Sequence, residues 1–548
     1  MNRREFLIES STKTGLLAGS LWLQPRLAPF LNAMETAGRT GQNSSAGKNS
    51  SASISFETSD PSYQNTYTKA LDVLAHNVTA VSGYPQPVLI EGSSYSGIWQ
   101  ECAPQEGLVY SRIRPDVARN NHLAFFALQR EDGQIPCWIR TKAVGFGQIQ
   151  MVVPIAATAW ELSQQTQDSE LLERAYTSCS RWDAWLRRYR DTRHTGLCEG
   201  FCTWDTGQDN SPRWAGMPNR CPDEDARKCP PVPSLPRLCP DLSATVCGGR
   251  VALAAMAHAL GKHSEAERWQ NDAETIRTLI INKLYSASDA AFYDLDAQNK
   301  LVRVRGDAIS RVLGEHVVDQ RMFEQIYRRE IHNPKAFWAP YPLPSIALDD
   351  PTFVRPIPRN SWGGASQALA ALRAPRWMEH YGKPADLAHM MQQWVNAIVR
   401  EGKFLQQIDP VDGKFTPDTG DYSPATLVFM DFTWRLAGVR ELENGIEWNL
   451  RPAVGQIHSS YRLKLSSGQT AEIKYSAAAK DHATAECWLN NKTLFRTNNT
   501  VRLITDRNGK LSGAAGIASE KAHIVLQRNG GAHKQQFSLE PNQKISLT

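Results

Sequence analysis

The sequence has no block of basic residues and no long apolar segment. Lys and Arg together exceed Asp and Glu by five in 548 residues, and the two signs are interspersed. Nucleic-acid-binding proteins usually carry a basic patch or stripe, so the composition argues against that class. The apolar run from Gly15 to Leu23 is shorter than the ~20 residues that a membrane-spanning helix needs. We therefore expect no nucleic-acid partner, and no membrane association of the mature form.

The cysteines lack the spacing of a metal site. Six of the ten lie between residues 198 and 247, their spacing matches no zinc template, and no paired histidines accompany them. We expect no metal and no cofactor, and instead predict that disulfides pin this stretch in an oxidising compartment. The spacing does not select one pairing. The six are Cys198, Cys202, Cys221, Cys229, Cys239 and Cys247.

The N-terminus is typical of an export signal. Arg3 and Arg4 are followed by Phe6 and Leu7 and then by the short apolar run. A twin arginine before such a run predicts a Tat-type signal peptide over residues 1–37. Residues 38–60, which begin as a Gly-, Ser- and Asn-rich stretch, are predicted to be a disordered linker. The mature protein is accordingly expected to be periplasmic or secreted.

Residues 61–445 carry a helical signal. Apolar residues recur at i, i+3 and i+4 in residues 151–167, 169–189, 249–262, 264–285 and 385–401. Roughly ten to twelve such helices arrive in pairs, joined by loops of uneven length. Pairs of helices with long loops rich in Trp, Asp, Asn and Gly predict a mainly α fold, an (α/α)6 barrel or six-hairpin toroid. No internal repeat indicates a solenoid.

The pattern changes after Asn444. The segment "YRLKLSSGQTAEIKYS" alternates apolar and polar residues, and Asn-Gly and Gly-Gly turns separate the short runs that follow it. Residues 446–548 are therefore predicted to form a small antiparallel β-domain, resembling a β-sandwich. Because this part lacks aromatic or acidic clusters, its expected role is packing.

The loop "FCTWDTGQDNSPRWAG", Phe201–Gly216, combines acidic, amide and aromatic side chains. A glycosidase needs a protonated carboxyl group over the glycosidic oxygen, polar groups for the sugar hydroxyls and apolar platforms for the ring. The loop supplies all three kinds. The same residues would also suit a cluster of Asx turns that caps a helix, so the loop alone leaves both interpretations open.

The motif "WDTGQDNSPRW" resembles the acid-bearing motif of the mannosylglycerate-hydrolase-like and family 63 glycoside hydrolases, Trp-Glu-Ser-Gly-x-Asp-Asn-Ser-x-Arg, which the trehalases of the same clan carry in a related form. Further segments resemble the family in the same order over residues ~90–440. They are "QREDGQIPCW", "GQIQMVVPIAATAWE", "AAFYDLD", "NSWGGASQAL" and "DPVDG…MDFTWRLAGV". The resemblance implies an (α/α)6 barrel and an inverting hydrolase of an oligosaccharide or glycoside, with two catalytic carboxylates.

The resemblance also assigns site residues. Asp209 falls at the position of the general acid, and Asp205 at that of a sugar-binding Glu. The other positions that the resemblance places around the sugar are Trp204, Asn210, Arg213, Trp214, Trp138, Gln150, Trp362, Gln406 and Trp434.

The general base is missing from this pattern. The family has a Glu where "FLQQIDP" has Gln406, and a glutamine amide cannot take a proton from water at neutral pH. Asp409 or Asp421 could substitute for the base, and Asp421 is favoured because Asp409, in an Asp-Pro pair, is already explained as a turn former. Alternatively phosphate attacks in place of water, or the chain binds sugars without cleaving them. Glu91, before a Gly-Ser-Ser-Tyr turn, and Glu101 could reach into the site, but both are interpreted as surface or turn residues, the commoner role of such acids.

Overall fold

The computed structural model describes residues 54–417, 420–452, 458–476, 483–528 and 533–547. The predicted signal peptide and most of the predicted linker lie outside these residues. In the described part, no helix has both the length and the apolar character needed to cross a membrane.

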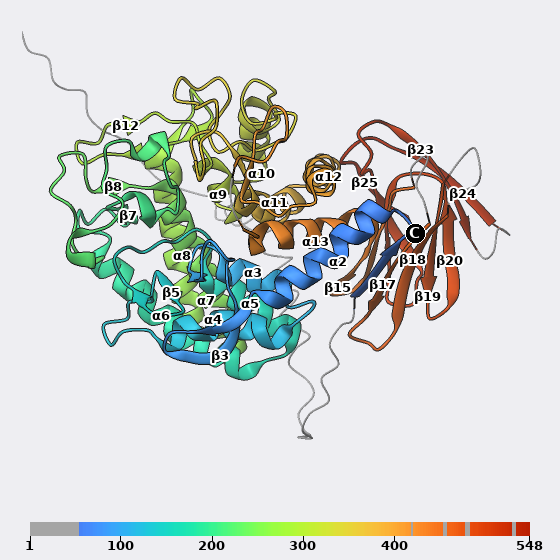
Figure 1. Ribbon diagram of the computed structural model, residues 1–548, viewed down its shortest axis with the longest axis horizontal. Helices are drawn as coiled ribbons and strands as arrows, with labels where there is room; N and C mark the ends of the chain where they lie inside the picture. Colours follow the sequence, from blue (N-terminus) through green and yellow to red (C-terminus); the bar gives the residue numbers. More distant parts are fainter. Residues whose placement is uncertain (1–53, 418–419, 453–457, 477–482, 529–532, 548) are drawn as a thin grey trace, which may run out of the picture. The chain divides into compact units, whose positions relative to one another are not determined.

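Helices dominate the chain from Pro61 to Ala437, and the five segments predicted from periodicity are helical (Figure 1). The helices are α2 (Pro61–His76), α3 (Ala103–Tyr110), α4 (Pro115–Ala127), α5 (Ile155–Thr166), α6 (Ser169–Tyr189), α7 (Pro240–Ala259), α8 (His263–Leu284), α9 (Ala308–Gly314), α10 (Gln320–Ile326), α11 (Ala368–His380), α12 (Pro384–Glu401) and α13 (Ser423–Ala437).

Six of these helices contact one another in a closed cycle. The contacts run from α3 to α5, α7, α9, α11 and α13, and α13 contacts α3 again. The intervening helices pack on this ring: α4 on α3, α6 on α5 and α7, α8 on α7, and α12 on α11 and α13. A closed ring of alternate helices, covered by their sequence neighbours, is the arrangement expected of a six-hairpin toroid.

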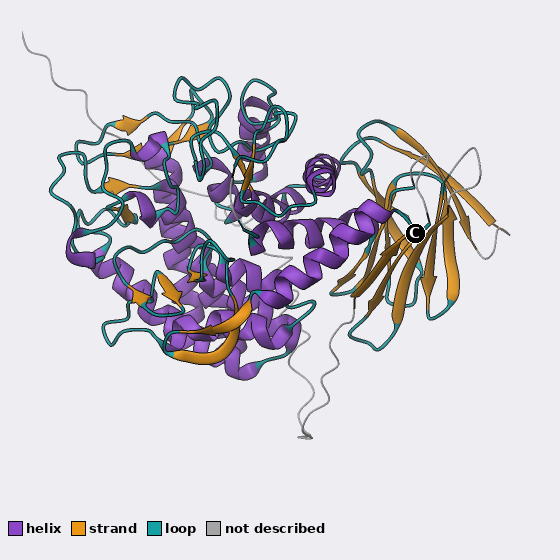
Figure 2. Cartoon of the chain, viewed as in Figure 1, coloured by secondary structure: helices purple, strands orange, loops and turns teal. Residues whose placement is uncertain are grey.

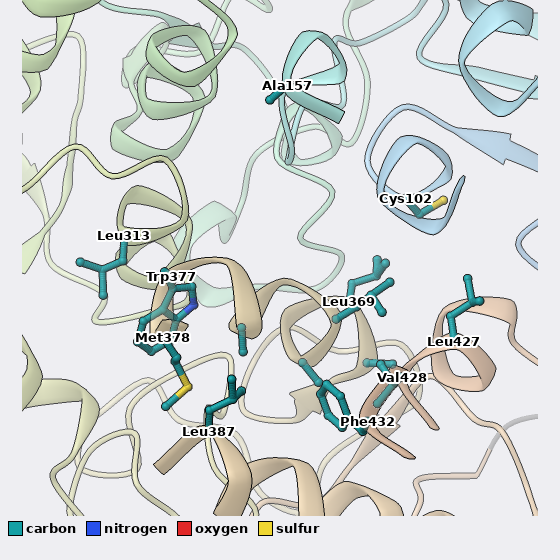
Figure 3. Close-up of a cluster of buried hydrophobic side chains, with 14 of the residues drawn as sticks. Cys102, Ala157, Leu313, Leu369, Trp377, Met378, Leu387, Leu427, Val428 and Phe432 are labelled. Carbon is teal, nitrogen blue, oxygen red and sulfur yellow. The ribbon is translucent and has the colours of Figure 1, made fainter. Parts of the chain in front are cut away.

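The sequence separates ring helices from covering helices. In α7, every residue from Pro240 to Gly248 is buried, and in α13 every residue from Ser423 to Trp434 is buried. A helix buried on all sides belongs inside a protein, whereas α6 and α12 bury one face and expose the other. Figure 3 shows apolar side chains that the helices contribute to the core. Those labelled are Cys102, Ala157, Leu313, Leu369, Trp377, Met378, Leu387, Leu427, Val428 and Phe432.

Short strands accompany the helices, and longer ones follow them (Figure 2). The short strands are β2 (Val78–Val81), β3 (Tyr84–Leu89), β4 (Gly97–Trp99), β5 (Trp138–Arg140), β6 (Val144–Gly145), β7 (Glu199–Gly200), β8 (Arg237–Leu238), β9 (Tyr285–Ser286), β10 (Ala291–Phe292), β11 (Asp294–Leu295), β12 (Leu301–Val302), β13 (Ser366–Gln367) and β14 (Gln407–Ile408). The C-terminal strands are β15 (Val439–Leu442), β16 (Gly445–Leu450), β17 (Ser459–Lys464), β18 (Thr470–Ser476), β19 (Thr484–Leu489), β20 (Lys492–Thr497), β21 (Val501–Thr505), β22 (Leu511–Ala515), β23 (Ala522–Arg528), β24 (His533–Leu539) and β25 (Lys544–Ser546).

The C-terminal strands form two antiparallel sheets. One has the order β1-β17-β18-β19-β20-β23-β24 and the other the order β15-β16-β21-β22-β25. β1 (Ile54–Thr58) comes from the predicted linker, and it pairs with β17 so that Ile54 lies opposite Leu463 and Thr58 opposite Ser459. The linker prediction is therefore wrong for residues 54–60. Ile54–Thr58 is a strand, and the side chain of Asp60 caps α2 by accepting from the backbone N–H of Ser62.

Candidate active site

The loops before the ring helices carry the polar residues of the candidate site. These loops precede α3, α5, α7, α11 and α13, and their side chains meet through the contacts described below. The residues concerned are Glu91, Tyr95, Glu101, Gln150, Trp204, Asp209, Asn360 and Gln406.

The turn that carries Asp209 follows from its sequence. Gly207 and Asn210 both have left-handed backbones, with φ of 61° and 56°, a conformation that Gly adopts freely and that Asn tolerates. After the turn, Pro212 begins a short 3-10 helix (Pro212–Trp214), and the Ser211 side chain accepts from the first free backbone N–H, that of Arg213. The turn leaves Asp209 partly exposed.

Asp209 lies in a setting that suits a general acid. Its Oδ2 accepts from Asn360 Nδ2 at 2.7 Å, and its carboxyl group also accepts from the side chain of Trp204. Burial raises the pKa of this carboxyl group, although both hydrogen bonds lower it. Its backbone carbonyl accepts from the N–H of Trp362 at 2.9 Å, which ties the turn to the loop before α11.

Gln406 is joined to Asp209 through Asn360. Gln406 Nε2 donates to Asn360 Oδ1 at 2.9 Å, and Gln406 Oε1 accepts from the hydroxyl of Tyr95 at 3.2 Å. The residue predicted at the position of the base therefore does lie in the same cluster as the residue predicted as the acid. The nitrogen and the oxygen of the Gln406 amide both form hydrogen bonds, and neither atom can act as a base toward water.

Asp205 is part of the scaffold and is closed off from a substrate. Its side chain is 0% exposed and forms a buried ion pair with Arg190, with Nη1 and Oδ2 2.5 Å apart. It also accepts from the backbone N–H groups of Ile149, Phe201 and Cys202. These contacts fix the start of the acid loop, so we correct the expected sugar-binding role of Asp205 to a structural one.

Three other expected sugar contacts are also buried in the scaffold. Arg213 bridges Asp241 and Asp294, with its Nη2 2.7 Å and 2.6 Å from their carboxylate oxygens. The indole of Trp214 donates to Thr206 Oγ1 at 2.9 Å, and the indole of Trp434 donates to the hydroxyl of Tyr67 at 3.2 Å. Because their polar atoms are already paired inside the protein, Arg213, Trp214 and Trp434 support the site without lining it.

The remaining expected wall residues differ in exposure. Trp204 and Trp138 are partly exposed, and an arginine lies over each ring: Arg220 at 4.9 Å and Arg140 at 4.9 Å from the ring centroids. Asn210 is exposed and donates to the carbonyl of Asn360. The other two expected wall residues, Trp362 and Gln150, are buried.

Asp409 has a structural role. Its carboxylate accepts from the backbone N–H of Val411 at 2.8 Å and from Arg355 Nε at 3.0 Å. It therefore forms a turn and an ion pair, which disfavours it as a base. Asp421 is partly exposed, and its backbone carbonyl lies against Gly92.

Sequence reasoning missed a buried carboxyl cluster beside Asp209. Glu91 is 4% exposed and accepts from the hydroxyl of Tyr422 at 2.8 Å. Burial and the neighbouring Glu106 raise its pKa to about 8. Burial, Glu91 and Asp209 raise the pKa of Glu101 well above its usual range. The interpretation of Glu91 and Glu101 as surface or turn residues is wrong. Their place in the segment that leads into α3 was the available signal.

The cysteines are free thiols in this structure, contrary to the predicted disulfides. Cys202 and Cys221 have their sulfurs 3.9 Å apart, beyond bonding distance. In two groups of Cys and Asp the side chains lie close enough together to share a metal ion. One group is Cys202, Asp205 and Cys221, and the other is Cys239, Asp241 and Asp294. An arginine already neutralises the carboxylates of each group, Arg190 in the first and Arg213 in the second.

A closed ring of helices whose loops gather a protonatable aspartate and partly exposed tryptophans at one site is characteristic of glycoside hydrolases, and this chain is a glycosidase. Residues 106–434 match the family of the mannosylglycerate hydrolase MGH1-like glycoside hydrolase domain, and the chain belongs to this family. A comparison with proteins of curated function gave no match.

Several solved structures share the fold. A GH63 mannosylglycerate hydrolase from Thermus thermophilus, in complex with glucose, is 20% identical over 67% of this chain and 99% of its own, with a TM-score of 0.56. The neutral trehalase of Saccharomyces cerevisiae is 13% identical over 67% of this chain and 80% of its own (TM-score 0.51). A GH78 rhamnosidase of Bacillus sp. GL1 is 11% identical over 78% of this chain and 40% of its own (TM-score 0.55).

Proposed function

We propose that the chain is an exported (α/α)6-barrel glycoside hydrolase, with a C-terminal β-domain, that cleaves an oligosaccharide or glycoside by inversion. The observation that carries the proposal is the setting of Asp209, which combines a raised pKa, partial exposure and contact with Trp204. Asp209 donates its proton to the glycosidic oxygen as the bond to the leaving group breaks. Trp204, whose side chain hydrogen-bonds to Asp209, offers its partly exposed surface to a sugar.

The second carboxylate of an inverting site takes the proton from the attacking water. Gln406 cannot do this, and the contacts of Asp409 disfavour it. Of the two aspartates that the sequence offers, Asp421 is the less constrained, because it is partly exposed.

The presence of Gln406 in the cluster favours a second candidate function. With phosphate as the nucleophile no base is needed, so a phosphorylase-like enzyme is consistent with an amide at this position. A sugar-binding barrel without catalysis is equally consistent with it.

One assay separates these functions. The purified protein is incubated with aryl glycosides, disaccharides including trehalose, and mannosylglycerate, with and without inorganic phosphate. Release of sugar without phosphate supports the hydrolase, and its anomeric form by proton NMR tests inversion. Sugar phosphate formed only with phosphate supports the phosphorylase. Binding without any product, with Asp209→Asn as the matched control, contradicts both.

A further inference from the structure

We propose that Glu101 is the second catalytic carboxyl group of this site, taking the proton from the attacking water in place of the side chain at position 406. The inference rests on the proposed hydrolase function. It names a residue that the sequence did not single out as catalytic.

Glu101 lies directly beneath the loop that carries Asp209. A Cβ atom added to Gly207, two residues before Asp209, would lie 1.6 Å from Glu101 Oε2. The carboxyl group of Glu101 thus occupies the space that a side chain at position 207 would take. Gly207 serves two purposes here, because its left-handed backbone also turns the chain toward Asp209.

The surroundings of Glu101 orient its carboxyl group and leave its buried Oε2 without a partner in the described part of the chain. The Gln150 side chain hydrogen-bonds to it, and the positive charges of Arg311 and Arg373 act on it. Its Oε2 has no hydrogen-bond partner among the residues that the structure describes. An unpartnered carboxylate oxygen in the interior is costly unless a ligand or a proton satisfies it.

The other buried acids of the cluster are less available. Glu91 is already bonded to the Tyr422 hydroxyl, and Glu106, whose two carboxyl oxygens also lack a partner among the described residues, is fully buried. Glu101 is partly exposed as a residue, although its Oε2 is buried. Of the three, Glu101 is therefore the one that can meet a water molecule in the site.

Glu101 and Asp209 also affect each other's protonation. The charge of Asp209 is one of the causes that raise the pKa of Glu101. Two carboxyl groups that interact in this way lose their protons in separate steps, so the pair holds one proton over a range of pH. Inverting hydrolysis requires Asp209 protonated and Glu101 ionised. Because burial raises the pKa of Glu101 well above its usual range, the acid limb of kcat/KM should lie at a higher pH than an ordinary glutamate gives.

The step balances as a hydrolysis. The water oxygen bonds to the anomeric carbon while one of its protons passes to the Glu101 carboxylate. The bond from the anomeric carbon to the leaving-group oxygen breaks, and that oxygen takes the proton of Asp209. Release of the products and transfer of one proton from Glu101 back to Asp209 restore the starting state.

The test compares Glu101→Gln with Glu106→Gln and Asp421→Asn, using an aryl glycoside that the wild type hydrolyses. Glu106 is a matched control because it is a buried glutamate of the same segment. We expect Glu101→Gln to lower kcat by ~100-fold or more, the scale of one lost proton transfer, with KM little changed, and the control to retain activity. Circular dichroism and melting temperature establish that each variant is folded.

A second readout distinguishes a base from a residue that only binds sugar. Azide needs no base, so it should restore turnover to Glu101→Ala and yield a glycosyl azide. A rise in KM without loss of kcat in Glu101→Gln, or no rescue by azide, overturns the proposal. The proposal is also overturned if Asp421→Asn shows this loss of kcat while Glu101→Gln remains active. A wild type that hydrolyses nothing contradicts the proposed function instead, which keeps the two failures distinct.

Discussion

Two aspartates four positions apart in one loop lie in opposite surroundings. Asp205 is fully buried against Arg190, and Asp209 is partly exposed beside Trp204. The motif identified the loop, and with it the expected acid. It could not show that Asp205 is structural instead of sugar-binding, because the partner of Asp205 comes from the end of α6, and only the folded chain brings Arg190 against it.

At Asp209 the expected change is catalytic. Asp209→Asn should lower kcat by ~100-fold or more on glycosides with poor leaving groups, because one proton transfer is lost. Aryl glycosides with good leaving groups, which need little protonation, should be affected far less. Comparing the two substrate types by steady-state kinetics checks this. Equal losses on both would contradict the role of Asp209 as the acid.

The same residue sets a pH dependence. An acid must be protonated to act, and burial raises the pKa of Asp209. Activity is therefore retained to higher pH than an ordinary aspartate would allow, and falls as the pH rises through this raised pKa. Profiles of kcat/KM against pH measure the alkaline limb, which should be absent from the residual activity of Asp209→Asn.

At Asp205 the expected change is one of stability. Asp205→Asn leaves the buried Arg190 without its counter-charge, which should lower the free energy of unfolding by about 3 kcal/mol. Urea denaturation of this variant beside Asp209→Asn measures the difference. If Asp205→Asn is as stable as the wild type but inactive, Asp205 acts on the substrate after all.

At the scale of elements, periodicity predicted two of the ring helices, α5 and α7, and three of the covering helices, but not the first strand. Continuous burial of α7 and the amphipathic pattern of α6 both follow from local composition. β1 was not predicted from the sequence, because it follows a Gly- and Ser-rich stretch and because an alternating pattern over five residues is a weak indication of a strand. Its partner β17 lies at the other end of the chain, where no local pattern connects the two.

β1 is expected to contribute to stability through Phe56. Its ring lies 5.4 Å from that of Tyr63 and 5.1 Å from that of Tyr67, so it joins the strand to α2. Phe56→Ala should lower the free energy of unfolding by about 3 kcal/mol. The exposed neighbour Ser55 provides a control, since Ser55→Ala should change it little. Equal thermal stability of the two variants would show that β1 is dispensable.

At the scale of the whole molecule, one ion pair joins the helical part to the C-terminal sheets. Arg502 of β21 contacts Glu379 of α11, with Nη1 and Oε2 2.7 Å apart. Although burial alone would raise the pKa of Glu379, the charge of Arg502 holds it at about 2. Sequence patterns predicted both parts, but not this pair, because neither residue is distinguished from other charged residues along the chain.

The pair gives stability a defined dependence on pH. The folded pKa of Glu379 lies below its ordinary value, so its contribution is present above about pH 4.5 and is lost as the pH falls toward about 2. Thermal melts from pH 7 to pH 2 should show a steeper loss for the wild type than for Glu379→Gln, which is less stable at neutral pH. Parallel curves would mean that Glu379 does not contribute.

The pairing of β1 with β17 also sets an order of assembly. The chain is synthesised from its N-terminus, so Ile54 leaves the ribosome long before its partner Leu463. The seven-stranded sheet cannot be completed until nearly the entire polypeptide has been synthesised, and its first strand must wait unpaired in the meantime. Under the export that we propose, in which a twin-arginine signal requires the folded state, closure of β1 onto β17 would be a late step before translocation. Pairing of the first described strand would then show that the C-terminal part of the chain has folded.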